Sequence, residues 1–196
     1  MKQAPHRTVS RAVAFGLCVL LAGSCGTVVR QGRGASYLII DVLTGTGSTP
    51  GTLQSDVLTK GSVFEDNGQA ILRMALKDIT TPSGPTSNNE ITITSYRVTF
   101  TRADGRNTPG VDVPYAFDGA ATGTVKVGNT MTLQFVLVRA QAKLEAPLSA
   151  LRGMGGAVII STIAEVTFYG HDQAGNQVSV AGTISVNFAD WADASS

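Results

Sequence analysis

The stretches VIISTIAEVTF (residues 158–168) and QVSVAGTISVNF (residues 177–188) decide the fold of this 196-residue chain. In both stretches the even-numbered positions carry most of the large apolar side chains, which are Val158, Ile160, Ala164, Val166 and Phe168 in the first and Val178, Val180, Ile184, Val186 and Phe188 in the second. A period of two residues is typical of a β-strand with one buried face. Because a slip of one residue would expose this whole set, we expect the two stretches to pair as a hairpin in one fixed register.

Shorter stretches of the same character fill the chain before this hairpin, and Gly, Pro, Asn and Asp separate them. They predict strands at residues 37–43, 53–59, 69–79, 91–101, 111–117, 124–127 and 131–138. Within residues 91–101 the apolar side chains change parity between Ile93 and Tyr96, which predicts a β-bulge. The strands at residues 124–127 and 131–138 are expected to pair across the Gly128-Asn129 turn.

One stretch, QAKLEAPLSALR at residues 141–152, departs from the strand pattern. Leu144, Leu148 and Leu151 have helical spacing, but Pro147 limits the helix to one or two turns. We therefore expect a short helical crossing between two sheets.

Eight or nine strands with frequent turns indicate an all-β fold at residues 36–189, in the form of an antiparallel two-sheet sandwich. The turn Asp172-Gln173-Ala174-Gly175-Asn176 and the strands beside it resemble the final hairpin of bacterial immunoglobulin-like domains, in which an Asp-x-Ala-Gly-Asn turn precedes an alternating strand. The resemblance covers residues 168–188 and implies an immunoglobulin-like sandwich. Such domains serve as spacers, adhesins and binding modules, so the resemblance implies no particular function.

The start of the chain has the pattern of a bacterial export signal. Lys2, Arg7 and Arg11 make it basic, and the uncharged stretch AVAFGLCVLLA follows at residues 12–22. A helix of that length spans about 16 Å, roughly half of the hydrocarbon thickness of a bilayer. We therefore interpret residues 1–24 as a secretory signal and not as a membrane-spanning helix.

The residues before Cys25, Leu21-Ala22-Gly23-Ser24, resemble the lipobox of bacterial lipoproteins. The resemblance implies cleavage before Cys25, attachment of diacylglycerol to its thiol and acylation of the new amino end, with residues 25–35 as a flexible tether. Cys18 is lost with the leader, which leaves Cys25 without a second cysteine to pair with in a disulfide. Lipidation would occupy this otherwise unpaired thiol. Gly26, in place of the Asp that favours retention at the inner membrane, favours the outer membrane. Ordinary signal cleavage after Ser24 is the alternative.

The charge of the exported part gives no sign of a nucleic-acid partner. Without the three basic residues of the leader, 12 basic and 14 acidic residues remain, for a net charge near −2. No stretch gathers Lys and Arg together with aromatic residues, which binding of DNA or RNA requires.

Residue types that carry catalysis or bind metals are scarce after the leader. His171 is the single histidine left, and we expect it to be a solvated turn residue rather than a catalytic base. One histidine and one lipidated cysteine do not supply a zinc site, which needs three or four nitrogen or sulfur ligands. Calcium takes oxygen ligands, so Asp172 and Asn176 are a weak candidate pair, although turn chemistry also explains them. We predict no cofactor.

Two further kinds of site stay open. A glycosidase needs two carboxylates, and the acidic residues available for that role are Glu65, Asp66, Glu90, Glu145 and Glu165. The parity of Glu165 places it on the outer face of its strand. Trp191, in the polar tail at residues 190–196, is the single candidate for an exposed aromatic anchor for glycans, and of the two alternatives we expect it to pack over the end of the sandwich instead.

We therefore expect a non-enzymatic lipoprotein of the cell envelope, held at the membrane through Cys25, that acts as a structural or protein-binding module with an envelope protein as partner. The alternatives are a periplasmic accessory subunit or hydrolase with an unrecognised carboxylate site, and a glycan-binding module. An exposed apolar patch or a long unpaired edge strand would favour protein binding.

Overall fold

The computed structural model describes residues 34–78, 80 and 84–191. The export signal, Cys25, most of the expected tether at residues 25–35 and residues 192–196 lie outside the described residues.

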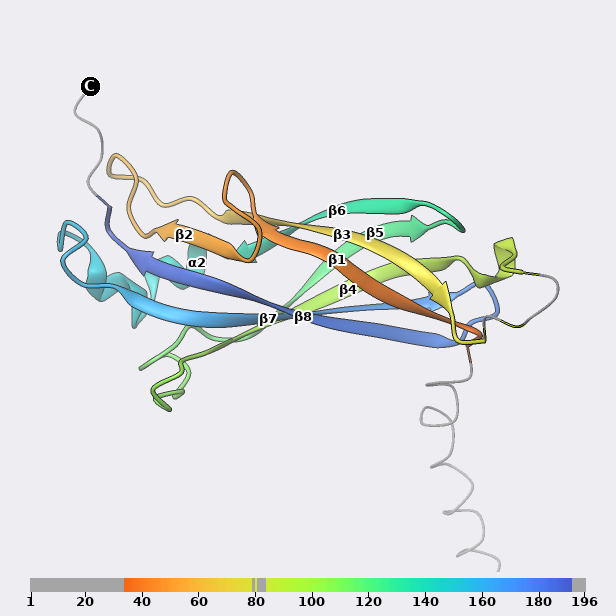
Figure 1. Cartoon of the computed structure of the whole chain (residues 1–196). Helices are drawn as coiled ribbons and strands as arrows, with labels where there is room; N and C mark the ends of the chain where they lie inside the picture. Colours follow the sequence, from red (N-terminus) through yellow and green to blue (C-terminus); the bar gives the residue numbers. More distant parts are fainter. Residues whose placement is uncertain (1–33, 79, 81–83, 192–196) are drawn as a thin grey trace, which may run out of the picture.

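The described residues form a sandwich of two sheets, which Figure 1 shows as two layers. The three-stranded sheet has the order β1 (Ser36–Gly45), β3 (Asp66–Leu76) and β6 (Thr130–Val138). The five-stranded sheet has the order β2 (Thr52–Asp56), β8 (Gln177–Ala189), β7 (Ile160–Asp172), β4 (Ile91–Thr101) and β5 (Phe117–Val125). The expected all-β sandwich of two sheets is therefore confirmed.

The expected final hairpin is confirmed. Strands β7 and β8 are antiparallel, and their register runs from Ile160 opposite Phe188 to His171 opposite Gln177. Most of the even-numbered apolar side chains face the core, where Ala164, Val166, Phe168, Ile184, Val186 and Phe188 are buried. Val158 is exposed because β7 begins only at Ile160, so the first member of the predicted set lies outside the strand.

The expected bulge in β4 is also confirmed. The register of β4 shifts between Ile93 and Ser95 against both of its neighbours. The shift allows Ile91 and Ile93 at odd positions and Tyr96 and Val98 at even positions to be buried on the same face.

The expectation of a strand at residues 111–117 was wrong for most of that stretch. Val111 is 66% exposed and Tyr115 is 51% exposed, and β5 begins only at Phe117. The backbone N–H groups of Val111, Asp112 and Val113 all point to the carbonyl oxygen of Thr108. Because this turn satisfies the backbone N–H groups locally, they do not form the hydrogen bonds of a strand pair, although the side chains alternate.

The hairpin expected across Gly128-Asn129 was wrong as well. Strand β5 pairs with β4, and β6 pairs with β3 in the other sheet. The turn therefore carries the chain from one sheet to the other. Phe117 of β5 and Phe135 of β6 both pack against the Tyr96 ring, with ring centroids 6.2 and 5.2 Å from it, so the two strands face each other across the core.

One strand pair differs from the antiparallel pattern of the others. Strand β2 runs parallel to the end of β8, from Thr52 opposite Ser185 to Asp56 opposite Ala189. Gly51 directly precedes β2 and connects the two sheets. Its N–H donates to the carbonyl oxygen of Leu43 in one sheet, and its carbonyl oxygen accepts a hydrogen bond from the N–H of Ser185 in the other. The sequence pattern did not predict this parallel pair, because period two reports the buried face of a strand and not its direction.

The expected helical crossing is confirmed. Helix α2 (Ala140–Leu144) and the 3-10 helix η2 (Leu148–Leu151) connect β6 to β7 and thus one sheet to the other. A second 3-10 helix, η1 (Ser87–Asn89), precedes β4.

The strand order gives the sandwich two different ends. At the end that we call the hairpin end, β1 begins, β7 turns into β8, and the hydroxyl of Ser36 donates to the Asn89 carbonyl. At the opposite end, which we call the crossing end, lie the connections at residues 57–65, 102–116 and 139–159 together with the end of β8. The first and last strands therefore enter and leave the sandwich at opposite ends (Figure 1).

Candidate functional site

Exposed apolar side chains gather at the crossing end. Among the described residues, seven of the ten exposed large hydrophobic side chains lie on the three connections there, and we call them the crossing-end set: Phe64, Val111, Tyr115, Leu144, Met154, Val158 and Ile159. The remaining three, Tyr37, Ile163 and Tyr169, lie on strands. Single exposed apolar residues need no explanation, but several at one end of a domain are typical of a contact surface.

Ion pairs shape one of these three connections. Arg102 Nη2 lies 2.6 Å and Arg106 Nε lies 3.2 Å from Oδ2 of Asp104. The hydrogen bond from Arg102, followed by the backbone N–H of Arg106, lowers the pKa of the Asp104 carboxyl. Asp104 also lines a hollow with Ile159 of the crossing-end set. Charged groups therefore border the apolar side chains, as in the polar rim of many protein interfaces.

Trp191 packs over the crossing end, which is the second of the two alternatives expected for it. Its backbone N–H donates to Oδ1 of Asp56 over 3.1 Å, and its ring lies over Gly156, where an added Cβ would be 3.5 Å away. This position makes Trp191 part of the end wall rather than an exposed platform for a sugar ring.

A buried lysine at the same end is a feature that sequence reasoning missed. Lys143 of α2 is 1% exposed, and its Nζ lies 2.9 Å from Oδ2 of Asp66 and donates to the Asp56 carbonyl over 2.7 Å. The hydroxyl of Ser55 donates to the same Asp66 oxygen over 2.6 Å. Burial raises the pKa of the Asp66 carboxyl, although the charge of Lys143 acts in the opposite direction. Nothing in the local sequence AQAKL indicates that this lysine points inward.

The candidate calcium residues lie together in the β7–β8 turn. Asp172 Oδ1 accepts hydrogen bonds from the backbone N–H groups of Ala174 and Asn176, and Oδ2 accepts one from the side-chain amide of Asn176. His171 Nδ1 lies 3.1 Å from the Asp172 carbonyl. In the part of the chain that the structure describes, no group of three or more His, Cys, Asp or Glu side chains is arranged to hold a metal ion. The contacts of Asp172 are those of an Asx turn.

The acidic residues considered for hydrolysis are distributed over several surfaces. Glu65 and Asp66 line a hollow of about 640 Å³ beside the β1–β2 turn, but the Asp66 carboxylate is held by Lys143 and Ser55. Glu165 lies on the exposed outer face of β7, as its parity predicts. Glu145 accepts a hydrogen bond from Gln141 at the end of α2.

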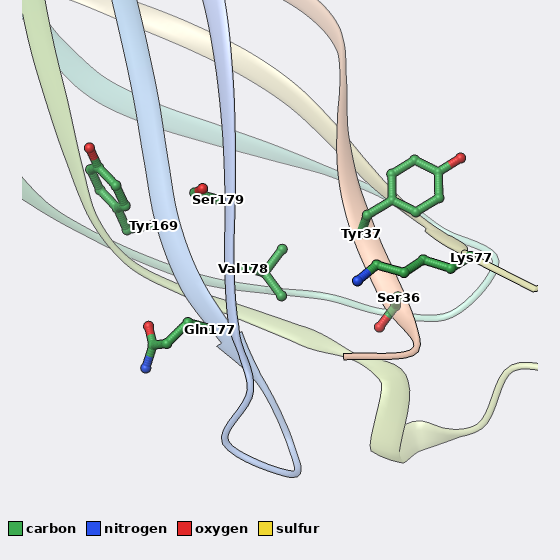
Figure 2. Close-up of a pocket in the computed structure, with 7 residues that line it drawn as sticks. All are labelled: Ser36, Tyr37, Lys77, Tyr169, Gln177, Val178 and Ser179. Atoms are coloured by element: carbon green, nitrogen blue, oxygen red, sulfur yellow. The ribbon is translucent and has the colours of Figure 1, made fainter. Parts of the chain in front are cut away.

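A seam runs between β1 and β8, where the two sheets have open edges. Among the described strands β1 pairs with β3 alone, and only the end of β1 near Leu43 and Thr44 has a further backbone contact, with Pro50 and Gly51. On its β2 side, β8 has a partner in the described residues only from Ser185 onward. Two hollows of about 320 and 620 Å³ follow this seam. Figure 2 shows the first of them, with the Tyr37 and Tyr169 rings on opposite sides of β8, so the two tyrosines do not form a common stacking platform.

Comparison with known proteins identifies no family for this chain. No protein-family model matches it, and no curated protein matches it. One solved structure similar to it is the sporulation control protein Spo0M from Bacillus subtilis, at 13% identity and a TM-score of 0.33. The match covers 78% of this chain and 49% of the Spo0M chain, so this chain spans about half the length of that protein. Among the described residues, no helix combines the length and apolar character needed to cross a bilayer.

Proposed function

We propose that this protein is a non-enzymatic lipoprotein of the cell envelope that binds a partner protein through its crossing end. The observation that carries the proposal is the gathering of the crossing-end set on three connections at one end of the sandwich. Leaving these side chains in water costs free energy that a partner surface would recover, at about 25 cal/mol for each Å² of apolar area buried.

The placement of the expected lipid supports the same proposal. The tether at residues 25–35 would lead from Cys25 to the start of β1, which lies at the hairpin end. A protein held there by two or more acyl chains would turn its crossing end away from the membrane. The apolar side chains would then face a partner in the envelope, with the outer membrane as the preferred location of the anchor.

The anchor is tested with Cys25→Ser in the full chain. The wild-type protein should fractionate with membranes and carry acyl chains at Cys25 by mass spectrometry, whereas the variant should be soluble and unacylated. A wild-type protein that is soluble and unacylated would exclude the lipoprotein assignment.

The binding end is tested by placing a photo-crosslinking amino acid at Phe64, at Tyr169 or at Tyr37 and irradiating intact cells. Phe64 is 59% exposed at the crossing end, Tyr169 lies on the outer face of β7, and Tyr37 lies beside the seam. We expect one adduct of defined mass from position 64 and none from the other two. Tyr115→Ser should abolish this adduct without changing the melting temperature. Equal adducts from all three positions, or an adduct from position 37 alone, would refute the assignment of the binding surface.

A further inference from the structure

The buried lysine at the crossing end has a reactive partner within reach. Lys143 Nζ lies 2.9 Å from Oδ2 of Asp66, although the two residues are 77 positions apart on α2 and β3. Among the described residues, Lys143 is one of the largest fully buried side chains, together with Phe168 and Phe188. Lysine is rarely buried to this extent, because its ammonium group loses the hydration that it has in water.

The remaining contacts hold both groups in place. The Asp56 carbonyl accepts a hydrogen bond from Nζ over 2.7 Å, which fixes the direction of the amine. The Ser55 hydroxyl donates to Asp66 Oδ2 over 2.6 Å, so this oxygen is bonded to both a hydroxyl and the lysine. Two groups that are held side by side in this way have an effective concentration far above that of free solutes, which favours a reaction between them.

Burial also acts against the charged form of the pair. Taking each ion out of water costs free energy, and the attraction between the two ions recovers this cost only in part. The pKa of the Asp66 carboxyl is raised, with burial as the largest cause. Transfer of one proton from Nζ to Oδ2 along the existing hydrogen bond gives a neutral amine and a neutral carboxylic acid, the forms that can condense.

We propose that Lys143 and Asp66 form an intramolecular amide bond. The lone pair of the neutral Nζ attacks Cγ of the protonated Asp66 side chain, and a C–N bond forms. Oδ2, which already carries one proton, receives a second from Nζ through the Ser55 hydroxyl and leaves as water. One ammonium and one carboxylate become one amide and one water molecule, with no oxidant, reductant or further reactant and no change in net charge.

The product would fit the same surroundings. The amide N–H retains the Asp56 carbonyl as acceptor, and the neutral link removes two charges from a site that water does not reach on the lysine side. The bond would fasten α2 to the start of β3 and thereby tie the crossing to the three-stranded sheet. Residues 34–191 contain no cysteine, so no disulfide can perform this task within the sandwich.

Peptide mass spectrometry of the purified full chain tests the bond directly. Trypsin cleaves after Lys60, Arg73, Arg139 and Arg152, and it cleaves after Lys143 only if that amine is free. We expect residues 61–73 and 140–152 to be recovered as one linked species, lighter than the two peptides together by one water molecule. Fragmentation should place the link at Asp66 and Lys143. Recovery of separate peptides ending at Lys143 and beginning at Leu144 as the main products would overturn the proposal.

Lys143→Arg is the matched variant, because it keeps the positive charge and removes the primary amine. In this variant the linked species should disappear, and the intact chain should be heavier by one water molecule than the wild-type mass corrected for the substitution. The wild-type digest decides the question even if this variant folds poorly. The mass measurement does not involve a partner, so the bond and the proposed function are tested independently.

Discussion

The hydroxyl oxygen of Tyr96 accepts a hydrogen bond from the backbone N–H of Val136, 3.1 Å away in the other sheet. Tyr96 reaches this position because the bulge between Ile93 and Ser95 turns it into the core. Its ring packs edge-on against Phe135, with centroids 5.2 Å apart. A single side chain thus joins the two sheets through both a polar and an aromatic contact.

Tyr96→Phe should destabilise the protein by about 1–2 kcal/mol, because it leaves the N–H of Val136 in the core without its acceptor. Urea unfolding followed by circular dichroism measures the loss. Tyr37→Phe is the matched control, since Tyr37 is exposed, and it should change the free energy of unfolding by less than about 0.5 kcal/mol. Equal losses from the two variants would contradict a special role for Tyr96.

Alkaline pH should weaken the wild-type protein more than Tyr96→Phe. Burial raises the pKa of the Tyr96 hydroxyl above the usual value near 10. Between the unfolded and the folded pKa, the folded protein keeps a proton that the unfolded chain releases, so the free energy of unfolding falls as pH rises through that range. Urea unfolding at a series of pH values should show the gap between the two proteins narrowing above pH about 10. A constant gap would show that Tyr96 does not titrate in this way.

Gly170→Ala should destabilise the protein by about 3 kcal/mol, at the upper end of the usual cost of overpacking. A Cβ added at Gly170 would lie 2.3 Å from the backbone carbonyl oxygen of Thr92 in the paired strand β4, and backbone in the middle of a sheet cannot move away. Gly123→Ala provides the control, because its nearest neighbour is the flexible end of Met131. Thermal unfolding should show a much larger loss for the first variant, and the reverse order would be inconsistent with the packing of β4 on β7.

Asp172→Ala should cost about 2–3 kcal/mol, because three N–H groups lose a charged acceptor in the β7–β8 turn. His171→Ala, one residue earlier, should cost less than about 0.5 kcal/mol because a half-buried side chain is removed without leaving a buried group unpaired. Chemical denaturation of both variants measures the difference. If the histidine variant lost as much stability as the aspartate variant, His171 would have a structural role that its contacts do not show.

The two partners of the buried pair should respond unequally to removal. Asp66→Ala leaves the ammonium group of Lys143 in a site that is 1% exposed, and should cost about 3–5 kcal/mol. Lys143→Met should cost less, since the Asp66 side chain is 20% exposed and its carboxylate can still reach water. Melting temperatures of the two variants give the order. A greater loss for Lys143→Met would contradict the burial of Lys143.

The β7–β8 hairpin and the β4 bulge could be predicted from the sequence because burial alone specifies them. The side chains of Phe168 and Phe188 require one face of the hairpin to be covered, and this requirement fixes the register. In β4, the change of parity between Ile93 and Tyr96 can be reconciled with a single core face only by inserting an extra residue.

Alternation of side chains did not predict which strands pair. Val111 and Tyr115 alternate like strand residues, but the Thr108 turn satisfies the backbone there. Val125 and Leu133 belong to different sheets although a short turn connects their strands. Which strands pair depends on contacts between distant parts of the chain, and a local pattern of side chains does not report such contacts.

The crossing-end set and the Lys143–Asp66 pair could not be predicted from the sequence, because both also depend on contacts between distant parts of the chain. The apolar residues at positions 64, 115 and 159 belong to three separate connections, which the strand order places at the same end of the sandwich. Lys143 lies in a short helix whose sequence is compatible with an exposed lysine, and its burial depends on Asp66 of a distant strand. The expectation that Trp191 packs over the sandwich succeeded because a tryptophan directly after the last strand has the end of the core within reach.

The parallel pairing of β2 with the end of β8 determines how the sandwich would bear a mechanical load. Tension applied between the start of β1 and the end of β8 pulls along the long axis, since these points lie at opposite ends. The hydrogen bonds of the β2–β8 pair lie across that axis, so the pull loads them in shear, all at once, instead of opening them one after another. Strands that are paired in this way resist stretching until all of their hydrogen bonds yield together.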